Sequence, residues 1–230
     1  MFAGNFSVIE VSNRRWRIAQ AAEIRWWKRY LAKQSVDEYS DWKKGYWTSL
    51  LKKLQLSLKP NARVLDAGCG PAGIFTALEQ CEVEAVDPLL KKYDSLDHFD
   101  RDQYPYVSWH AQPLETFKGK ASFDYVFCLN VINHVRDLDV ATEVLAKAAK
   151  PDGTLIISVD AHRHKWLKPI FRTIPGDVLH PHQLDLKDYE ELFERHGMSV
   201  VDKVLYRKEF LFDYWVFPLQ LKSENPSAHG

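Results

Sequence analysis

The sequence predicts an α/β protein built on a mostly parallel sheet, and two patterns carry this prediction. From residue 63 onward, short apolar runs alternate with helical patterns, as expected where crossover helices join parallel strands. Near the C-terminus, strand candidates at 199–205 and 210–217 are close enough to form a hairpin, so the final strand should be antiparallel. With 230 residues, 46% of them hydrophobic, the chain can form one domain with a modest appendage.

The remaining elements follow from composition and from start and stop signals. The other expected strands are 63–68, 83–86, 105–109, 123–128 and 154–159. A helix is expected over 71–81, opened by Pro71, and another over 137–150, closed by Pro-Asp-Gly. A third helix, KDYEELFERHG, ends at Gly197, which is placed to cap it.

The N-terminal extension reads as two helices, over 13–33 and 36–58, because its apolar residues recur at helical spacing. Between Arg14 and Lys59 there are twelve Lys and Arg against four Asp and Glu, with five of the eight Trp. Core packing with a solvated basic face accounts for most of these residues. Two further roles stay open: a lid over a ligand, with WKKGYW (42–47) as its best candidate, and weak contact with an anionic membrane surface.

Charge and cysteine usage argue against several classes of protein. The net charge is zero, which gives no bulk attraction to nucleic acid, so no such partner is expected. The three cysteines, Cys69, Cys81 and Cys128, lack disulfide-like spacing and fit a reducing compartment. Charges interrupt every long apolar run, and the N-terminus has no apolar signal region. We therefore expect a cytoplasmic protein.

A glycine-rich loop follows the first expected strand. The stretch VLDAGCGPAG (64–73) contains G-x-G-x-x-G, beginning with Gly68 and Gly70, and such a loop offers backbone N–H groups and a helix N-terminus to a nucleotide. Asp66 would repel a pyrophosphate but would suit a ligand that carries an ammonium group and a sulfonium. Asp87, at the end of the second strand, is placed to accept both ribose hydroxyls, which either class of ligand would offer.

Three further motifs follow the loop in order. They are A-V-D-P (85–88), F-D-Y-V-F-C-L-N-V-I-N-H-V (123–135) and K-P-D-G-T-L-I-I-S-V (150–159). With the loop, they resemble the class I S-adenosylmethionine (SAM)-dependent methyltransferases over about residues 60–217. An NAD-dependent dehydrogenase is the alternative, but the Tyr-x-x-x-Lys pair of short-chain dehydrogenases occurs only as Tyr39 and Lys43, before the loop.

The resemblance implies a fold and a cofactor. The fold is a Rossmann-like sheet of seven strands, mostly parallel with an antiparallel last strand, with helices on both faces, and the cofactor is SAM. The residues implied to line its methionine part are Asp66, Ala67, Gly68 and Gly70. Asp87 would bind the ribose hydroxyls, Pro88 would pack near the adenine, and Asn130 would lie near the amino-acid end.

The adenine site departs from the family pattern. Members often have an acid followed by Ala after the third strand, and the acid binds the adenine amino group. In this chain His110 takes the place of the acid. The backbone of Ala111 and the side chain of Gln112 become the implied adenine contacts.

The chain is thus expected to divide into three parts. Residues 1–59 form the helical extension or lid, and 60–222 form the SAM-binding domain. Within that domain, 160–185 is a long connection of the kind that usually covers a binding site. Residues 223–230 form a tail that should fray.

The acceptor is not fixed by any motif. The N-P-P-Y or D-P-P-Y signature of the amino-methylating nucleic-acid enzymes is absent, because the segment here is NVIN (130–133). We expect methyl transfer to an oxygen or nitrogen of a small molecule or glycan. A protein or lipid-linked acceptor and a non-catalytic SAM-binding protein are the alternatives.

Histidines are the candidates for a general base, since their pKa lies near working pH. His134, four residues after Asn130, and His180, near the end of the long connection, should lie at the edge of the sheet where ligands bind; His182 is a weaker candidate. The connection is rich in His, but no acid or Cys completes a zinc site, so no metal is expected.

Overall fold

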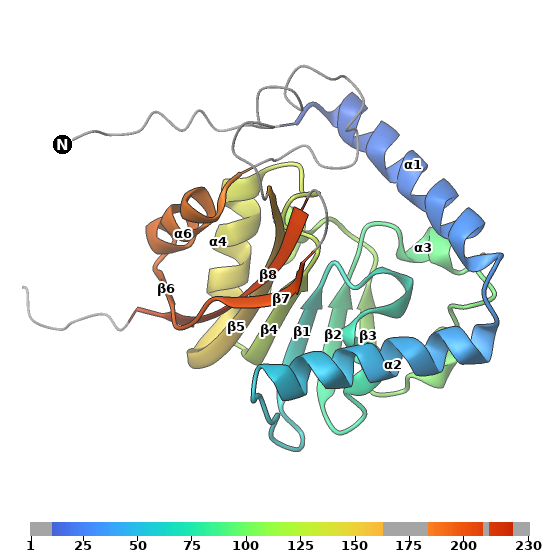
Figure 1. Cartoon of the computed structure of the whole chain (residues 1–230), viewed down its shortest axis with the longest axis horizontal. Coiled ribbons are helices and arrows are strands. Elements are labelled where there is room, and N and C mark those ends of the chain that lie inside the picture. Colours follow the sequence, from blue (N-terminus) through green and yellow to red (C-terminus); the bar gives the residue numbers. More distant parts are fainter. Residues whose placement is uncertain (1–10, 163–183, 209–211, 223–230) are drawn as a thin grey trace, which may run out of the picture.

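The chain forms one mixed β-sheet with helices on both faces (Figure 1). The structure is a computed structural model, and it describes residues 11–162, 184–208 and 212–222. The strands are β1 Arg63–Ala67, β2 Glu82–Val86, β3 Val107–His110, β4 Phe123–Leu129, β5 Ala149–His162, β6 Met198–Val200, β7 Val204–Lys208 and β8 Phe212–Leu221. Their order is β3-β2-β1-β4-β5-β8-β6, and β7 pairs with β8.

Strands β1 to β5 run parallel, whereas β8 is antiparallel to β5, β6 and β7. This confirms the mostly parallel sheet with an antiparallel last strand. The single strand predicted at 199–205 is instead two strands, β6 and β7. Between them the three residues 201–203 face only two residues of β8, and one of these is Pro218, which has no N–H to donate to the ladder.

The described helices are α1 Asn13–Leu31, α2 Val36–Lys53, α3 Leu90–Tyr93, α4 Leu138–Ala148 and α6 Leu186–Arg195. Three of them, α1, α4 and α6, begin at a short polar side chain that caps them. Ser12 caps α1, Asp137 caps α4 through the N–H of Val140, and Asp185 and Asp188 form a capping box on α6. Gly197 has φ +74° and follows His196, the C-cap residue of α6, where the sequence predicts a glycine cap.

The helix expected over 71–81 is absent, and this prediction was wrong. The chain forms two short 3₁₀ turns instead, Gly70–Ala72 and Ile74–Ala77, separated by extended backbone at Gly73. A side chain at Gly73 would overlap the carbonyl oxygen of Cys69 and would lie 2.5 Å from Oδ2 of Asp66. The tight fold of the loop onto the end of β1 therefore replaces the first turns of a helix.

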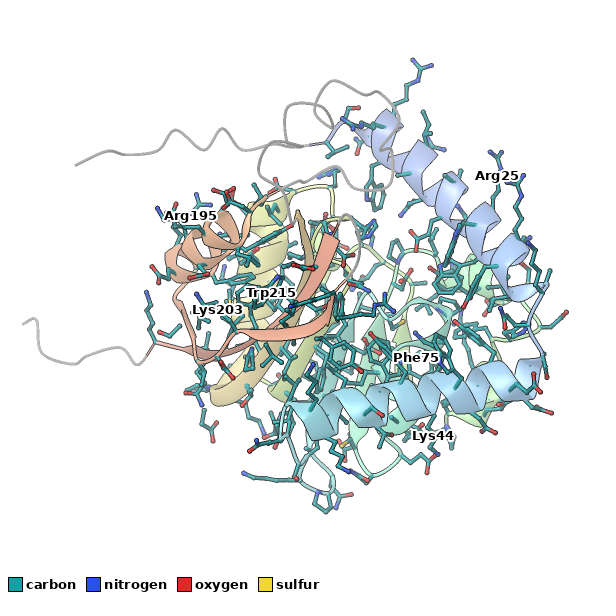
Figure 2. All side chains as sticks on the ribbon, in the orientation of Figure 1. Arg25, Lys44, Phe75, Arg195, Lys203 and Trp215 are labelled. Carbon is teal, nitrogen blue, oxygen red and sulfur yellow. The ribbon has the colours of Figure 1, made fainter. Side chains whose placement is uncertain are left out.

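Helix α2 covers the sheet face beside these turns. Phe75 is fully buried there, and Figure 2 shows it between α2 and the sheet. The indole Nε1 of Trp47 on α2 donates a 3.0 Å hydrogen bond to the carbonyl oxygen of Ala72. The N-terminal extension is therefore part of the core of the domain.

Alternate residues of each strand feed two separate cores, as the strand period of two requires. Val64, Tyr125 and Phe127 face α2 and the 3₁₀ turns. Leu65 and Val126 face the other side, which α4 and α6 cover. Figure 1 shows α4 and α6 together on one side of the sheet and α2 along the other.

The strand order reverses between β1 and β4, because β2 and β3 lie on one side of β1 and β5 lies beyond β4. In open α/β sheets, ligands bind beyond the carboxyl ends of the strands at this point. The fold alone thus directs attention to the segments after β1, β2, β4 and β5.

The close packing at Gly73 leads to a stability prediction. Gly73→Ala should lower the free energy of unfolding by about 1–3 kcal/mol, because the added methyl overlaps backbone atoms. Gly45→Ala in α2 is the matched control. No atom lies within 4 Å of its added methyl, so this change should raise the free energy of unfolding by roughly 0.5–1 kcal/mol. Urea unfolding of both variants measures the contrast, and equal effects would contradict it.

Candidate functional site

A cavity of about 550 Å³ lies at the predicted position, beyond the carboxyl ends of β1, β2, β4 and β5. Its volume is in the usual range of about 300–1,000 Å³ for small-molecule sites. Residues after these strands form its floor, and α1 and α2 supply the opposite wall. The side chains that this wall contributes are Trp16, Gln20, Glu23, Trp26, Trp27, Lys43 and Trp47.

The glycine loop forms part of the floor through its backbone. Gly68 and Gly70 have φ values of +76° and +59°, a region that favours glycine. The N–H of Gly68 donates to the carbonyl oxygen of Val86 over 2.7 Å, which ties the loop to the end of β2. A side chain at Gly68 would also overlap Val131 after β4. Both glycines line the cavity.

Asp87 lies at the end of β2, where the sequence predicts it, and lines the cavity with Pro88. Its two carboxylate oxygens accept hydrogen bonds from the N–H groups of Gly70 (3.0 Å) and Leu89 (2.7 Å). Burial, together with the nearby Glu23, raises its pKa to about 7. The carboxylate is held rigidly and retains lone pairs for a ligand hydroxyl.

Asp66 does not line the cavity. It is 2% exposed, and its Oδ2 accepts a 3.1 Å hydrogen bond from the N–H of Phe75, beneath the glycine loop. Burial raises its pKa to about 7. Ala67 is also buried, in the core below the floor. Both residues shape the loop from behind, whereas the resemblance places them along the cofactor.

Helix α1 brings a half-buried carboxylate, that of Glu23, into the cavity wall. Oε1 of Glu23 accepts hydrogen bonds from Nε1 of Trp27 (3.4 Å) and from the hydroxyl of Tyr93 (3.3 Å). Burial raises the pKa of Glu23. Nearby, Nε2 of Gln20 is buried and has no hydrogen-bond partner among the described residues. Because Gln20 lines the cavity, this amide nitrogen is available to donate a hydrogen bond to a ligand.

Lys43 is a half-buried cation of the cavity wall. Its ammonium lies 4.5 Å from the ring centroid of Trp47 and 5.3 Å from that of Tyr46. Burial lowers its pKa to about 8, although the nearby Asp66 acts in the opposite direction. The sequence marks the WKKGYW segment as a possible lid but does not distinguish Lys43 from its neighbour Lys44.

The segment after β4 forms the far side of the cavity. Asn130 has φ +60°, and its N–H donates a 2.8 Å hydrogen bond to Oγ of Ser158. Ser158 in turn lies 2.7 Å from the hydroxyl of Tyr214 on β8. Asn130 and His134 both line the cavity, so the structure brings together these two sequence-predicted residues.

Two acids that the sequence analysis missed also line the cavity, Glu115 and Asp160. Oε1 of Glu115 accepts hydrogen bonds from the N–H groups of Arg136 (2.7 Å) and Asp137 (3.2 Å). Asp160 lies near the end of β5, where ligand contacts are expected in this fold. Its position near the end of a predicted strand is therefore the sequence feature that could have identified Asp160 as a cavity residue.

Ala111 and Gln112 lie outside the cavity lining. The N–H of Gln112 donates to the carbonyl oxygen of His110 over 3.0 Å, and this tight turn sends its side chain to a second hollow, of about 430 Å³. Pro113 and Leu114 line the main cavity in their place. The adenine contacts implied for Ala111 and Gln112 therefore have no support from the geometry.

Two of the histidine candidates, His180 and His182, lie outside the described residues, as does most of the connection 160–185. Within the described ranges, no group of three or more His, Cys, Asp or Glu is placed to hold a metal ion.

Comparisons with known proteins identify the family to which the chain belongs. Residues 39–203 match the family model of a methyltransferase domain. The ubiquinone biosynthesis O-methyltransferase of Xanthomonas campestris pv. campestris (strain B100) is 33% identical over 105 residues, 43% of each chain. That of Rickettsia canadensis (strain McKiel) is 30% identical over 97 residues, 41% of each. The match thus spans about two fifths of the length of these curated relatives.

Solved structures share the fold across nearly the whole chain. The 1,6-didemethyltoxoflavin-N1-methyltransferase of Burkholderia thailandensis, bound to 1,6-didemethyltoxoflavin and S-adenosylhomocysteine, aligns with a TM-score of 0.64 and 17% identity, covering 97% of this chain and 99% of its own. The magnesium protoporphyrin IX methyltransferase of Synechocystis, bound to SAH, gives 0.62 and 20%, covering 91% and 100%.

The fold is that of the class I SAM-dependent methyltransferases. The chain belongs to the methyltransferase-domain family, whose model covers most of its length. The cavity offers groups that suit this cofactor: the carboxylate of Asp87 and the glycine backbone on its floor, and the half-buried ammonium of Lys43 on the opposite wall.

The raised pKa of Asp66 leads to a pH prediction. Because its folded pKa of about 7 exceeds the ordinary value of 3.8, the folded state binds more protons than the unfolded state between these values. Stability is therefore lost as pH rises through this window. Asp66→Asn should remove that loss. The free energy of unfolding of the variant, relative to that of the wild type, should therefore rise from pH 4 to pH 7 in urea unfolding.

Asp124→Asn is the control of opposite sign. The hydrogen bond from Lys150 lowers the pKa of Asp124, so the wild-type carboxylate stabilises the fold at neutral pH and loses this effect as pH falls. An Asp66 variant without any pH-dependent difference from the wild type would contradict the assignment.

Proposed function

We propose that the protein transfers the methyl group of SAM to an oxygen or nitrogen of a small acceptor with a flat ring. The observation that carries this proposal is the position of α1, whose inner side chains line the cavity opposite the strand ends. An acceptor must be small enough to lie under this helix. A folded protein or a nucleic-acid duplex does not meet that condition.

The cavity wall favours a ring. Trp16 and Trp27 contribute indole rings, and Val131 and Val135 contribute apolar side chains. Aromatic rings of a ligand pack well against such surfaces. The ubiquinone O-methyltransferases and the didemethyltoxoflavin N-methyltransferase, to which this chain is similar, also take small molecules by their names.

Each residue of the cavity floor is assigned to the part of the cofactor that its hydrogen-bonding groups and its position suit. Asp87 binds the ribose hydroxyls through its remaining lone pairs, with Pro88 beside the adenine. The backbone of Gly68 and Gly70 takes the methionine part, and Asn130 lies near its amino-acid end. When bound, SAM supplies a methyl group on a sulfonium, which is already a good leaving group.

Lys43 is assigned to the carboxylate of the cofactor's methionine. It is a half-buried cation that lines the cavity, and a charge that is partly removed from water gains from a partner of opposite sign. The neighbouring Asp66 is engaged by the N–H of Phe75. A ligand carboxylate at this wall would complete the neutralisation of the ammonium.

His134 is assigned as the base that accepts the proton of an acceptor hydroxyl. It lines the cavity in the segment after β4, while Asp160 lines it from the end of β5. A protein group at either place can orient the acceptor and take its proton. His180, which lies outside the described residues, stays a second candidate from the sequence.

The test of the function is a screen with SAM carrying a radiolabelled methyl group. Phenols, quinols, nitrogen heterocycles, sugars, lipid-linked acceptors and peptides are offered separately, and label is counted in each product. We expect label on a small ring compound. Label only on glycans, lipid-linked compounds or peptides would overturn the proposal, and so would tight SAM binding without transfer to any acceptor.

With that acceptor, His134→Ala should lower turnover by roughly 100-fold to 10,000-fold while leaving SAM affinity unchanged. His98→Ala is the control, because His98 lies outside the cavity, with its Nε2 3.2 Å from the carbonyl oxygen of Gln34. If His134→Ala and the control turn over equally, His134 is not the base.

A ligand comparison tests Lys43. Lys43→Met should weaken S-adenosylhomocysteine binding by about 10-fold to 100-fold but leave binding of 5′-methylthioadenosine unchanged, since that nucleoside lacks the amino-acid carboxylate. Asp87→Ala should weaken both ligands, because both keep the ribose. Calorimetry of both ligands on each variant gives the comparison.

Lys44→Met is the matched control for Lys43. Lys44 is solvent-exposed and forms an ion pair with Glu79, so its loss should change neither affinity. Equal weakening of the two ligands by Lys43→Met would show that Lys43 does not bind the carboxylate.

A further inference from the structure

The outer face of α1 carries a stripe of positive charge. Five cations recur at helical spacing and fall within roughly 120° of the helix circumference at 3.6 residues per turn. They are Arg14, Arg17, Arg25, Lys28 and Arg29, and all are exposed. Figure 2 shows Arg25 pointing away from the body of the protein.

This charge is not compensated within the described part of the chain. The single acid of α1 is Glu23, which lies on the opposite face and is hydrogen-bonded to Trp27 and Tyr93. No carboxylate of the described residues forms an ion pair with the five cations. The protein as a whole has zero net charge, so the stripe is a local excess.

Exposed apolar side chains lie within and beside the stripe. Ile18 is 52% exposed within the stripe, and Trp26, 49% exposed, lies between the stripe and the face that lines the cavity. The ring of Trp26 stacks on Tyr30, with centroids 5.0 Å apart. An indole that is half buried against one aromatic ring and half in water is typical of residues at a membrane interface.

We propose that α1 binds the surface of an anionic lipid bilayer through this face. The five cations would meet lipid phosphates, and Ile18 and Trp26 would enter the headgroup region. None of the described helices is long and apolar enough to cross a membrane, so the contact is peripheral. A nucleic acid would use the cations but would leave Ile18 without a role.

The two faces of α1 then have complementary uses. Its inner face lines the cavity with Trp16, Gln20 and Glu23, while its outer face would rest on lipid. The cavity wall would lie at the membrane surface, within reach of an amphipathic acceptor. The docking itself does not depend on which acceptor the enzyme methylates.

Vesicle sedimentation with the full chain tests this proposal. We expect binding to vesicles with about one third phosphatidylglycerol, no binding to phosphatidylcholine alone, and loss of binding as salt rises. The triple variant Arg17→Gln/Arg25→Gln/Arg29→Gln should lower the partition coefficient by about 100-fold, since each cation near such a surface contributes about fivefold. Ile18→Gln should also weaken binding.

The matched control is Lys59→Gln/Lys118→Gln/Lys120→Gln, which removes the same charge from exposed lysines at the amino-terminal edge of the sheet. It should bind vesicles as the wild type does. A thermal shift with S-adenosylhomocysteine shows that each variant is folded. Wild-type protein that ignores anionic vesicles, equal loss in both triple variants, or preferential binding to RNA unaffected by Ile18→Gln would overturn the proposal.

Discussion

The contact between α2 and the turns that follow β1 is the constraint on which the rest of the structure depends. Gly73 lets the chain fold back so tightly that no α-helix can follow the glycine loop. The sheet face above Val64 and Phe127 then needs another cover, and α2 supplies it. The hydrogen bond from Trp47 to Ala72 fixes the helix against the loop itself. Cofactor site and N-terminal extension are thus one unit.

The sequence predicted the sheet well because its strands are locally encoded. Runs such as TLIISV and the caps at Asp137 and Gly197 carry their own signals, and the hairpin spacing indicated the antiparallel strand. The helix after the loop was mispredicted for a non-local reason. Pro71 is acceptable at a helix start, but the position of Asp66 and Cys69 around Gly73 decides the conformation, and this is visible only in three dimensions.

The site was predicted in part for the same reason. Gly68, Gly70, Asp87, Pro88 and Asn130 line the cavity because each sits next to a strand end that the sequence locates. Asp66, Ala67, Ala111 and Gln112 lie one layer away, since a one-residue step along a strand or turn reverses the direction of a side chain. Lys43, Glu23 and Asp160 reach the cavity from separate elements, and only the packing of α1 and α2 reveals them.

The hydrogen bonds from Asn130 through Ser158 to Tyr214 link the segment after β4 to β5 and β8. The part of the cavity proposed for the acceptor thus depends on several elements, unlike most of the part proposed for the cofactor. In the proposed arrangement, the cofactor half comes mainly from the two short segments after β1 and β2, with Asn130 and Lys43 added from other elements. The acceptor half is assembled from α1, the segment after β4 and the end of β5, which meet only in the folded chain. Substitutions on α1 can therefore change the choice of acceptor without touching the nucleotide floor. Within such a family, acceptor preference is free to diverge while the methyl donor stays the same.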